Sequence, residues 1–222
     1  MFEGNLINVE GRTMKIKKLL IGLLCMATLG GINNIGQHVF TVDGDTSVID
    51  ILNKNKEINI SPVLTFDEMV REVAKENGIS IIQAQQELGF TAKSARQART
   101  ARATYRALSQ SLTDNVSYRP TMRFYCETSE SGNFRAIKRI VRVEMIRGYN
   151  GLSKQFGGTV YVHLEDANRI FYIVNGDFFN NGSTTWNAGV NIGVGRNASI
   201  KFGVTNTTSH YQYCYVESHL RF

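Results

Sequence analysis

The pattern of the second half of the chain constrains the fold more than any other feature. From about residue 116 onward, short runs of Val, Ile, Tyr, Phe and Thr are separated by clusters of turn residues. Branched and aromatic residues favour strands, and strands at this spacing are typical of a sandwich or a small barrel. The sequence therefore predicts a mainly β fold, with an antiparallel β-sandwich over residues 115–222. The seven expected strands lie near 117–127, 134–147, 157–164, 169–176, 184–194, 198–205 and 210–222.

Three of these strands carry apolar side chains at every second position. Because alternate side chains of a strand share one face, these positions are expected to point into the core. The nine predicted core residues are Val160, Val162, Leu164, Val190, Ile192, Val194, Ile200, Phe202 and Val204.

Residues 63–112 are predicted to be a helical segment that precedes the β region. Thr65 with Glu68, and Ser80 with Gln83, fit capping boxes, in which a hydroxyl and a side-chain carbonyl or carboxylate satisfy each other's backbone donors. Apolar residues at helical spacing follow the first box. They are Phe66, Met69, Val70 and Val73.

An alanine-rich stretch over residues 92–106 closes the helical segment and carries five regularly spaced bases. If the stretch is helical, these side chains lie along one face. One interpretation is a solvated helix or connector. The other is a basic stripe that contacts an anionic polymer or lipid headgroups, which would make a peripheral membrane contact. The five residues are Lys93, Arg96, Arg99, Arg102 and Arg106.

Residues 1–31 are predicted to be an N-terminal extension plus a secretory signal peptide. Three lysines, at positions 15, 17 and 18, precede an apolar run over residues 19–29, which is shorter than the ~20 residues of a membrane anchor. Residues 32–62 are expected to form a loosely structured leader. The protein is therefore predicted to be secreted and extracellular, with association at the cell surface as a further hypothesis.

The chain carries a formal net charge of +6, which favours contact with anionic surfaces. An exported protein does not meet a promoter, so we predict no nucleic-acid partner. The expected partner is a cell-wall glycan or another anionic polymer. Export also favours a disulfide between Cys126 and Cys214, although two buried thiols remain the alternative.

Three segments of the β region carry a resemblance to a known group of proteins. They are Tyr149–Gly151, Gly157–Val162 and Ile173–Phe178. This region resembles uncharacterised secreted proteins of Gram-positive bacteria that end in a β-rich domain of unknown function. The resemblance covers roughly residues 105–222 and implies a secreted bacterial protein, but it implies no site residue.

No residue pattern defines a catalytic site, and we predict no cofactor and no metal ion. Residues 193–198 spell G-x-G-x-x-A, but a strand pattern follows where the dinucleotide fingerprint needs a helix, which favours a tight turn. The histidines lack the paired spacing of a zinc site. A secreted hydrolase that uses Glu165 or Asp177 is kept as an alternative, since paired carboxylates serve glycoside hydrolysis.

An aromatic row is the most informative surface in the sequence. Tyr211, Tyr213 and Tyr215 occupy alternate positions of the last strand, and Trp186 lies in a neighbouring run. An exposed row of this kind stacks on sugar rings, whereas a covered row packs on the helices or on a sheet partner. We therefore predict a non-enzymatic binding module for carbohydrate or anionic wall polymer. A secreted antagonistic or membrane-directed protein is the alternative from another class.

Overall fold

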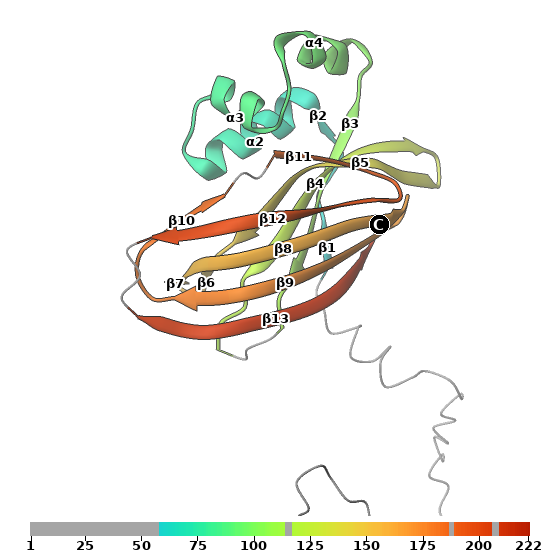
Figure 1. Cartoon of the computed structure of the whole chain (residues 1–222). Helices are drawn as coiled ribbons and strands as arrows, with labels where there is room; N and C mark the ends of the chain where they lie inside the picture. The colour runs from blue at the N-terminus through green and yellow to red at the C-terminus, as the bar shows by residue number, and fades with distance from the viewer. Residues whose placement is uncertain (1–57, 114–116, 187–188, 206–208) are drawn as a thin grey trace, which may run out of the picture. The chain divides into compact units, whose positions relative to one another are not determined.

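The computed structural model describes residues 58–113, 117–186, 189–205 and 209–222 (Figure 1). The predicted signal peptide and residues 32–57 of the predicted leader lie outside the described residues. Within the described ranges, no helix has both the length and the apolar character that crossing a membrane requires.

Three helices and a larger number of strands make up the described chain. The helices are α2 (Phe66–Asn77), α3 (Ile81–Glu87) and α4 (Ala92–Thr100). The strands before residue 150 are β1 (Ile58–Ile60), β2 (Leu64–Thr65), β3 (Thr104–Ser111), β4 (Thr121–Ser131), β5 (Phe134–Ile146) and β6 (Gly148–Tyr149). The remaining strands are β7 (Leu152–Ser153), β8 (Gln155–Asp166), β9 (Arg169–Phe179), β10 (Ser183–Trp186), β11 (Gly189–Gly193), β12 (Arg196–Thr205) and β13 (His210–Arg221).

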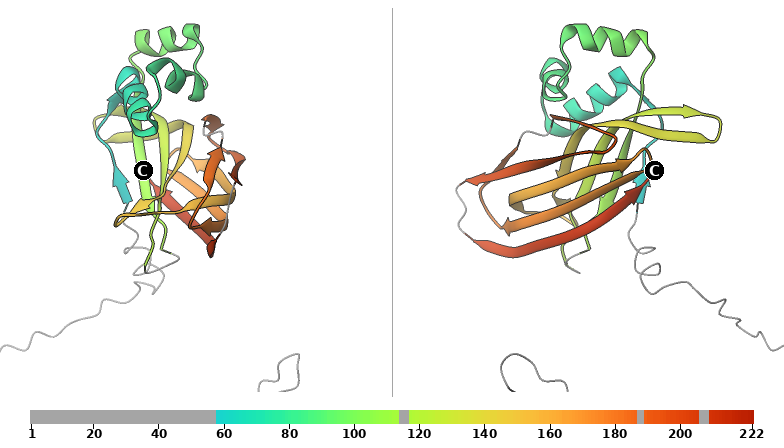
Figure 2. Two further views of the ribbon diagram at one scale, coloured as in Figure 1. Left: turned by 90° about the vertical axis from the view of Figure 1, so that its left-hand side faces the viewer. Right: turned by 45° about the vertical axis from the view of Figure 1, so that its right-hand side comes forward.

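The strands form two large antiparallel sheets (Figure 2). The first sheet has the order β1-β3-β4-β5-β11, and β2 also pairs with β3. The second sheet has the order β10-β12-β8-β9-β13. A short ribbon of β6 and β7 stands apart from both. The prediction of a mainly β, antiparallel fold is confirmed.

One apolar core lies between the two sheets. It takes side chains from both, such as Phe124 of β4 and Tyr172 of β9, whose ring centroids are 5.2 Å apart. Because each sheet places alternate residues in this core, the opposite positions of every strand face outward.

The helices cover the outer face of the first sheet. A second cluster joins Met69 and Val73 of α2 to Tyr105, Tyr125 and Val141 of the strands beneath. Both predicted capping boxes are present, and each helix begins where its box requires. Two opposite faces of the first sheet are therefore buried, one under the helices and one against the second sheet.

The described chain has more strands than the predicted seven: the short strands β1, β2, β6 and β7 were not predicted, and two larger differences concern β3 and the pair β10 and β11. Strand β3 lies inside the segment predicted to be helical, because α4 ends at Thr100 and Arg102 has a φ of 49°. The single strand expected over 184–194 is divided into β10 and β11, which belong to different sheets.

Six of the nine predicted core residues are buried. Val190 and Val204 are half-buried, and Val194 is 50% exposed because it lies in the turn between β11 and β12. Residues 193–198 thus form the predicted turn and the start of a strand, with Gly195 at a φ of 72°.

The predicted disulfide is wrong. Cys126 lies on β4 in the first sheet and Cys214 on β13 in the second, and both are buried thiols. A disulfide needs Cα atoms about 4.4–6.8 Å apart. Alternation predicts that both cysteines point into the core, but it does not predict the position of each cysteine along its strand relative to the other sheet.

The relative positions of the two cysteines along their strands follow from one contact between the sheets. Ser218 donates a hydrogen bond to Gln110, whose cross-strand partner is Met122. Strands β4 and β13 begin at the same end of the core, because Tyr118, which precedes β4, packs its ring on Tyr211 at the start of β13. Cys126 lies four residues beyond Met122, whereas Cys214 lies four residues before Ser218. Four strand residues span about 13 Å, so the two thiols are displaced in opposite directions.

Candidate functional site

Within the described chain, the outer face of the second sheet carries a larger number of exposed aromatic side chains than any other sheet face. Tyr213 and Tyr215 of β13 are 53% and 50% exposed. Their positions follow from the alternation of β13, in which Cys214 and Val216 point into the core. The two rings therefore stand side by side on one face, about 7 Å apart along the strand.

Polar groups of β9 lie next to these rings. The β13–β9 register places Tyr213 opposite Asp177 and Tyr215 opposite Asn175. The Tyr213 hydroxyl donates to Oδ1 of Asn175 at 3.0 Å, and Nε2 of His210 lies 2.9 Å from Oδ1 of Asp177. Rings, an amide and a carboxylate thus share one surface that a ligand can reach.

A second aromatic group continues the surface along the sheet. The rings of Tyr161 and Phe171 are 6.2 Å apart, and those of Phe171 and His219 are 4.8 Å apart. We call this surface the tyrosine face. Its residues are Tyr161, Phe171, Asn175, Asp177, Tyr213 and Tyr215. Of these six residues, only Tyr213 and Tyr215 were among the four predicted ligand contacts, because the positions of the other four depend on strand register.

Two of the four predicted ligand-binding residues differ from the expected arrangement. Tyr211 turns toward the core and packs on Tyr118 with a ring distance of 5.9 Å. A register irregularity between His210 and Gln212 breaks the alternation at this point. Trp186 pairs through its backbone with the position of Phe202, at the opposite edge of the second sheet from β13.

The five predicted basic contacts do not share one helix face. Lys93 and Arg96 are exposed on α4. Arg99 binds Asp67 at 2.9 Å, with its guanidinium 4.9 Å from the ring centroid of Phe66. The last two are Arg102, which follows the helix at positive φ, and Arg106, which lies on β3 and binds Glu130 at 2.5 Å.

The two carboxylates considered for a hydrolase lie far apart. Asp177 is opposite Gly157 on β8, and Glu165 lies eight residues further along that strand. Eight strand residues span about 26 Å, whereas glycoside hydrolysis needs carboxyl groups about 5–10 Å apart. Glu165 instead binds Arg169 at 2.6 Å. In the described part of the chain, no three His, Cys, Asp or Glu side chains are grouped as metal ligands.

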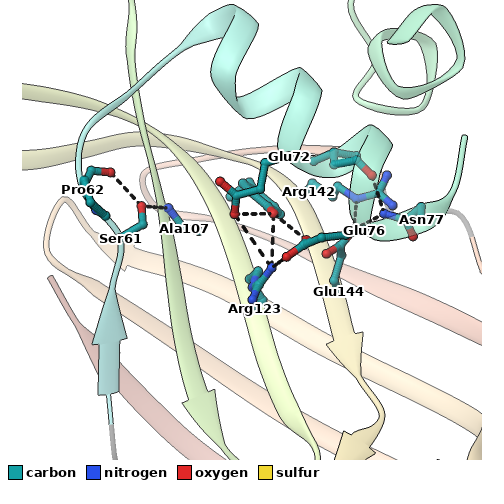
Figure 3. Close-up of polar contacts among 11 residues, drawn as sticks. Ser61, Pro62, Glu72, Glu76, Asn77, Ala107, Arg123, Arg142 and Glu144 are labelled. Carbon is teal, nitrogen blue, oxygen red and sulfur yellow. Dashed lines mark hydrogen bonds and ion pairs between the residues drawn. The ribbon is translucent and has the colours of Figure 1, made fainter. Parts of the chain in front are cut away.

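A charged cluster between α2 and the first sheet is the second candidate (Figure 3). Arg123 of β4 binds Glu76 and lies 3.9 Å from Glu72. The Tyr125 hydroxyl lies 2.8 Å from a carboxylate oxygen of Glu76 and 3.0 Å from one of Glu72, so its single proton can go to either acceptor. These contacts join the helix to the sheet.

The neighbouring pair in Figure 3 is more deeply buried. Arg142 and Glu144 of β5 bind each other, and their side chains are only 1% and 6% exposed. Asn77 of α2 donates to Glu144 at 3.1 Å, and Glu87 of α3 accepts from Arg142 at 3.1 Å. Because every charge has a partner, we interpret this cluster as the attachment of the helices.

A polar pocket of about 360 Å³ opens on the part of the first sheet beside this cluster. Its floor is made of short polar side chains together with Arg123, whose charge is already neutralised by Glu72 and Glu76. The pocket has no aromatic side chain to stack on a ligand. Its lining is Asn59, Ser109, Ser111, Thr121, Arg123 and Ile146.

Comparison with known proteins adds no assignment. No family model, no curated protein and no solved structure matches this chain. The resemblance to secreted Gram-positive proteins therefore stays a prediction, and the candidate site rests on the geometry of the tyrosine face alone.

Proposed function

We propose that this protein is a non-catalytic binding module that holds carbohydrate on its tyrosine face. In this proposal the two facing sheets form a β-sandwich that serves as a rigid platform. The observation that carries the proposal is the pair of half-exposed rings, Tyr213 and Tyr215, on a sheet face that no described helix covers.

The chemistry of the face fits a sugar ring. The faces of an aromatic ring carry partial negative charge, so they attract the weakly positive C–H groups of a pyranose. The amide of Asn175 and the carboxylate of Asp177 offer hydrogen bonds to hydroxyl groups at the edge of that sugar. Two rings in a row serve successive units of a polymer better than one isolated monosaccharide.

The charges of the face favour a neutral glycan over an anionic polymer. Asp177 and Glu217 contribute negative charge beside the tyrosines, and Lys201 contributes positive charge on β12, three strands from β13 in the sheet order. This mixture gives no attraction for a polyanion, although the whole chain is basic. We therefore expect binding that depends weakly on salt.

A binding assay on purified bacterial cell-wall glycan and on soluble neutral polysaccharides tests the proposal. Tyr213→Ala and Tyr215→Ala should each weaken binding about 5–10-fold, since a ring contact contributes about 1–1.5 kcal/mol. Tyr213→Phe should retain most of the affinity because it keeps the ring. Phe134→Ala is the matched control, because Phe134 is 60% exposed but lies at the start of β5 in the first sheet, whereas Tyr213 and Tyr215 lie on the second.

Two results would count against this function. Equal retention of the wild type and the Tyr213→Ala/Tyr215→Ala double variant would remove the tyrosine face from binding. If the retention of the protein on glycan disappears at high salt, and Phe134→Ala is retained at low salt as well as the wild type, the result would favour an anionic polymer bound through the basic residues instead.

The proposal also includes export from the cell, since a wall glycan lies outside the membrane. Cell fractionation combined with the intact mass of the purified protein measures both the location and any cleavage near residue 31. Full-length material found only inside the cell would contradict export.

A further inference from the structure

Strand β13 is the longest sheet edge in the described chain. It pairs with β9 on one side and with no described strand on the other, over the 12 residues His210–Arg221. The strands at the other three edges, β1, β10 and β11, are described over 3 to 5 residues. Proteins commonly keep edge strands short to prevent pairing with another chain, and β13 does not follow that rule.

The backbone groups at this edge can be assigned from one hydrogen bond. The amide of Phe222 donates to the carbonyl of Asn168 at 2.9 Å, so even-numbered residues of β13 point their backbone groups toward β9. In an antiparallel ladder the direction alternates along the strand. The outward groups therefore belong to the odd-numbered residues, which are Tyr213, Tyr215, Glu217, His219 and Arg221.

Three of the usual protections of an edge are lacking along this part of β13, although it carries the exposed charges of Glu217 and Arg221. Residues 212–221 contain no proline and no lysine, and the inward-facing side chains include no charge. The only register irregularity lies at the start of the strand, between His210 and Gln212. A straight row of outward N–H and C=O groups is a template for a further strand.

We propose that this edge pairs with the same edge of a second copy of the chain. The two copies of β13 run antiparallel about a two-fold axis beside Ser218, and the two second sheets become one continuous sheet. In this register Glu217 lies opposite the partner's His219, and Tyr215 lies opposite the partner's Arg221. Each pair brings together outward backbone groups and complementary side chains on the tyrosine face.

Charge complementarity selects this register over its neighbours. An axis beside Glu217 places that carboxylate opposite the partner's Glu217, and like charges directly opposite destabilise a sheet. An axis beside Val216 brings no opposite charges together. An axis beside His219 matches Glu217 with the partner's Arg221 but places the two His219 side chains directly opposite each other. The axis beside Ser218 matches Glu217 with His219 without pairing like side chains, and symmetry repeats the match on the other side.

The dimer has a consequence for the proposed function. Tyr213 and Tyr215 lie on the strand at the junction, so the tyrosine faces of both copies join into one surface. A polysaccharide that spans the junction engages both copies, which raises its apparent affinity. This consequence rests on the proposed function, whereas the dimer itself does not.

Light scattering and sedimentation of the full chain test the dimer. The concentration should cover about 10 µM to 1 mM, because an interface made by one pair of strands is small and is expected to have modest affinity. We expect a monomer–dimer equilibrium within that range. Glu217→Pro should abolish the dimer and preserve the fold, because the amide of Glu217 points away from β9 and proline is tolerated on an outward edge position.

A charge swap tests the register. His219→Glu should weaken the dimer at least tenfold, because it brings two carboxylates together across the junction, and Glu217→Lys/His219→Glu should restore it. Lys201→Glu is the matched control, since it changes a charge on β12 away from the edge. A wild type that stays monomeric up to about 1 mM, association that survives Glu217→Pro, or failure of the double variant to recover would each overturn the proposal. Circular dichroism confirms that each variant is folded.

Discussion

The buried pair of Arg142 and Glu144 offers the sharpest test of how the helices are held to the first sheet. Arg142→Met removes a guanidinium that is 1% exposed and leaves the Glu144 carboxylate buried with only the amide of Asn77 as a partner. Removing one member of such a pair costs about 3–5 kcal/mol, because the remaining charge stays desolvated. A chain of this size loses about 2–4 °C in Tm per kcal/mol, so the expected fall in Tm is about 6–20 °C.

The double variant Arg142→Met/Glu144→Leu should be more stable than Arg142→Met. Removing both charges ends the desolvation penalty: the Asn77 amide keeps the carbonyl of Val73 as its acceptor, and Glu87, which loses Arg142, is 48% exposed and can be solvated. We expect a coupling free energy of about 2–4 kcal/mol from urea unfolding of the wild type, both single variants and the double variant. Circular dichroism follows the transition of each protein.

Arg139→Met is the matched control for this cycle. Arg139 lies on the same strand and binds Glu127 at 2.8 Å, but its side chain is 33% exposed. A pair open to water contributes about 0–1 kcal/mol. Additive single and double variants at positions 142 and 144, or a cost for Arg142→Met no larger than that for Arg139→Met, would refute the interpretation of this pair as a buried attachment.

Three further predictions concern the sheets. Gly176→Ala should lower the free energy of unfolding in urea by about 1–3 kcal/mol, since a Cβ at this position would lie 2.4 Å from the carbonyl oxygen of Gly157. Gly193→Ala is the control and should lower it less, because a Cβ there has no atom within 4 Å. Burial raises the pKa values of Tyr105 and Tyr118 to about 12, against about 10 in the unfolded chain, so the folded state holds these protons more tightly and stability should fall as the pH rises from about 10 to 12. A flat unfolding midpoint over that pH range would contradict this. Reductant should leave the Tm unchanged. Cys126 and Cys214 should react with a thiol reagent only after unfolding, because both thiols are buried. Burial also raises the pKa of the Cys126 thiol, which lowers its reactivity further.

Local signals predicted the local structure well. The capping boxes at Thr65 and Ser80 form as expected, because each depends on residues three apart in the chain. The six long strands β4, β5, β8, β9, β12 and β13 also overlap the predicted strands, whereas the strand predicted over 184–194 is divided between the two sheets. Strand β3 was not predicted, because its alanine and arginine continue the composition of α4, and only the turn at Arg102 separates the two elements.

The candidate site depended on information that the sequence does not carry. Alternation predicts that Tyr213 and Tyr215 share a face, but it does not say which of two sheets the helices cover. The irregularity near His210 turned Tyr211 inward, and no residue pattern marks it. The cysteines illustrate the same limit, since alternation predicts the face on which each cysteine lies but not its position along the strand relative to the other sheet.

The placement of β3 has a consequence for any attempt to divide this chain. The strand pairs along its whole length with β4, while Leu108 fills the core between the sheets and Tyr105 supports the helices. A fragment that starts at residue 115 would lack an interior strand of its first sheet and would uncover the apolar side chains that Leu108 contacts. The helices and the sheets should therefore be expressed together.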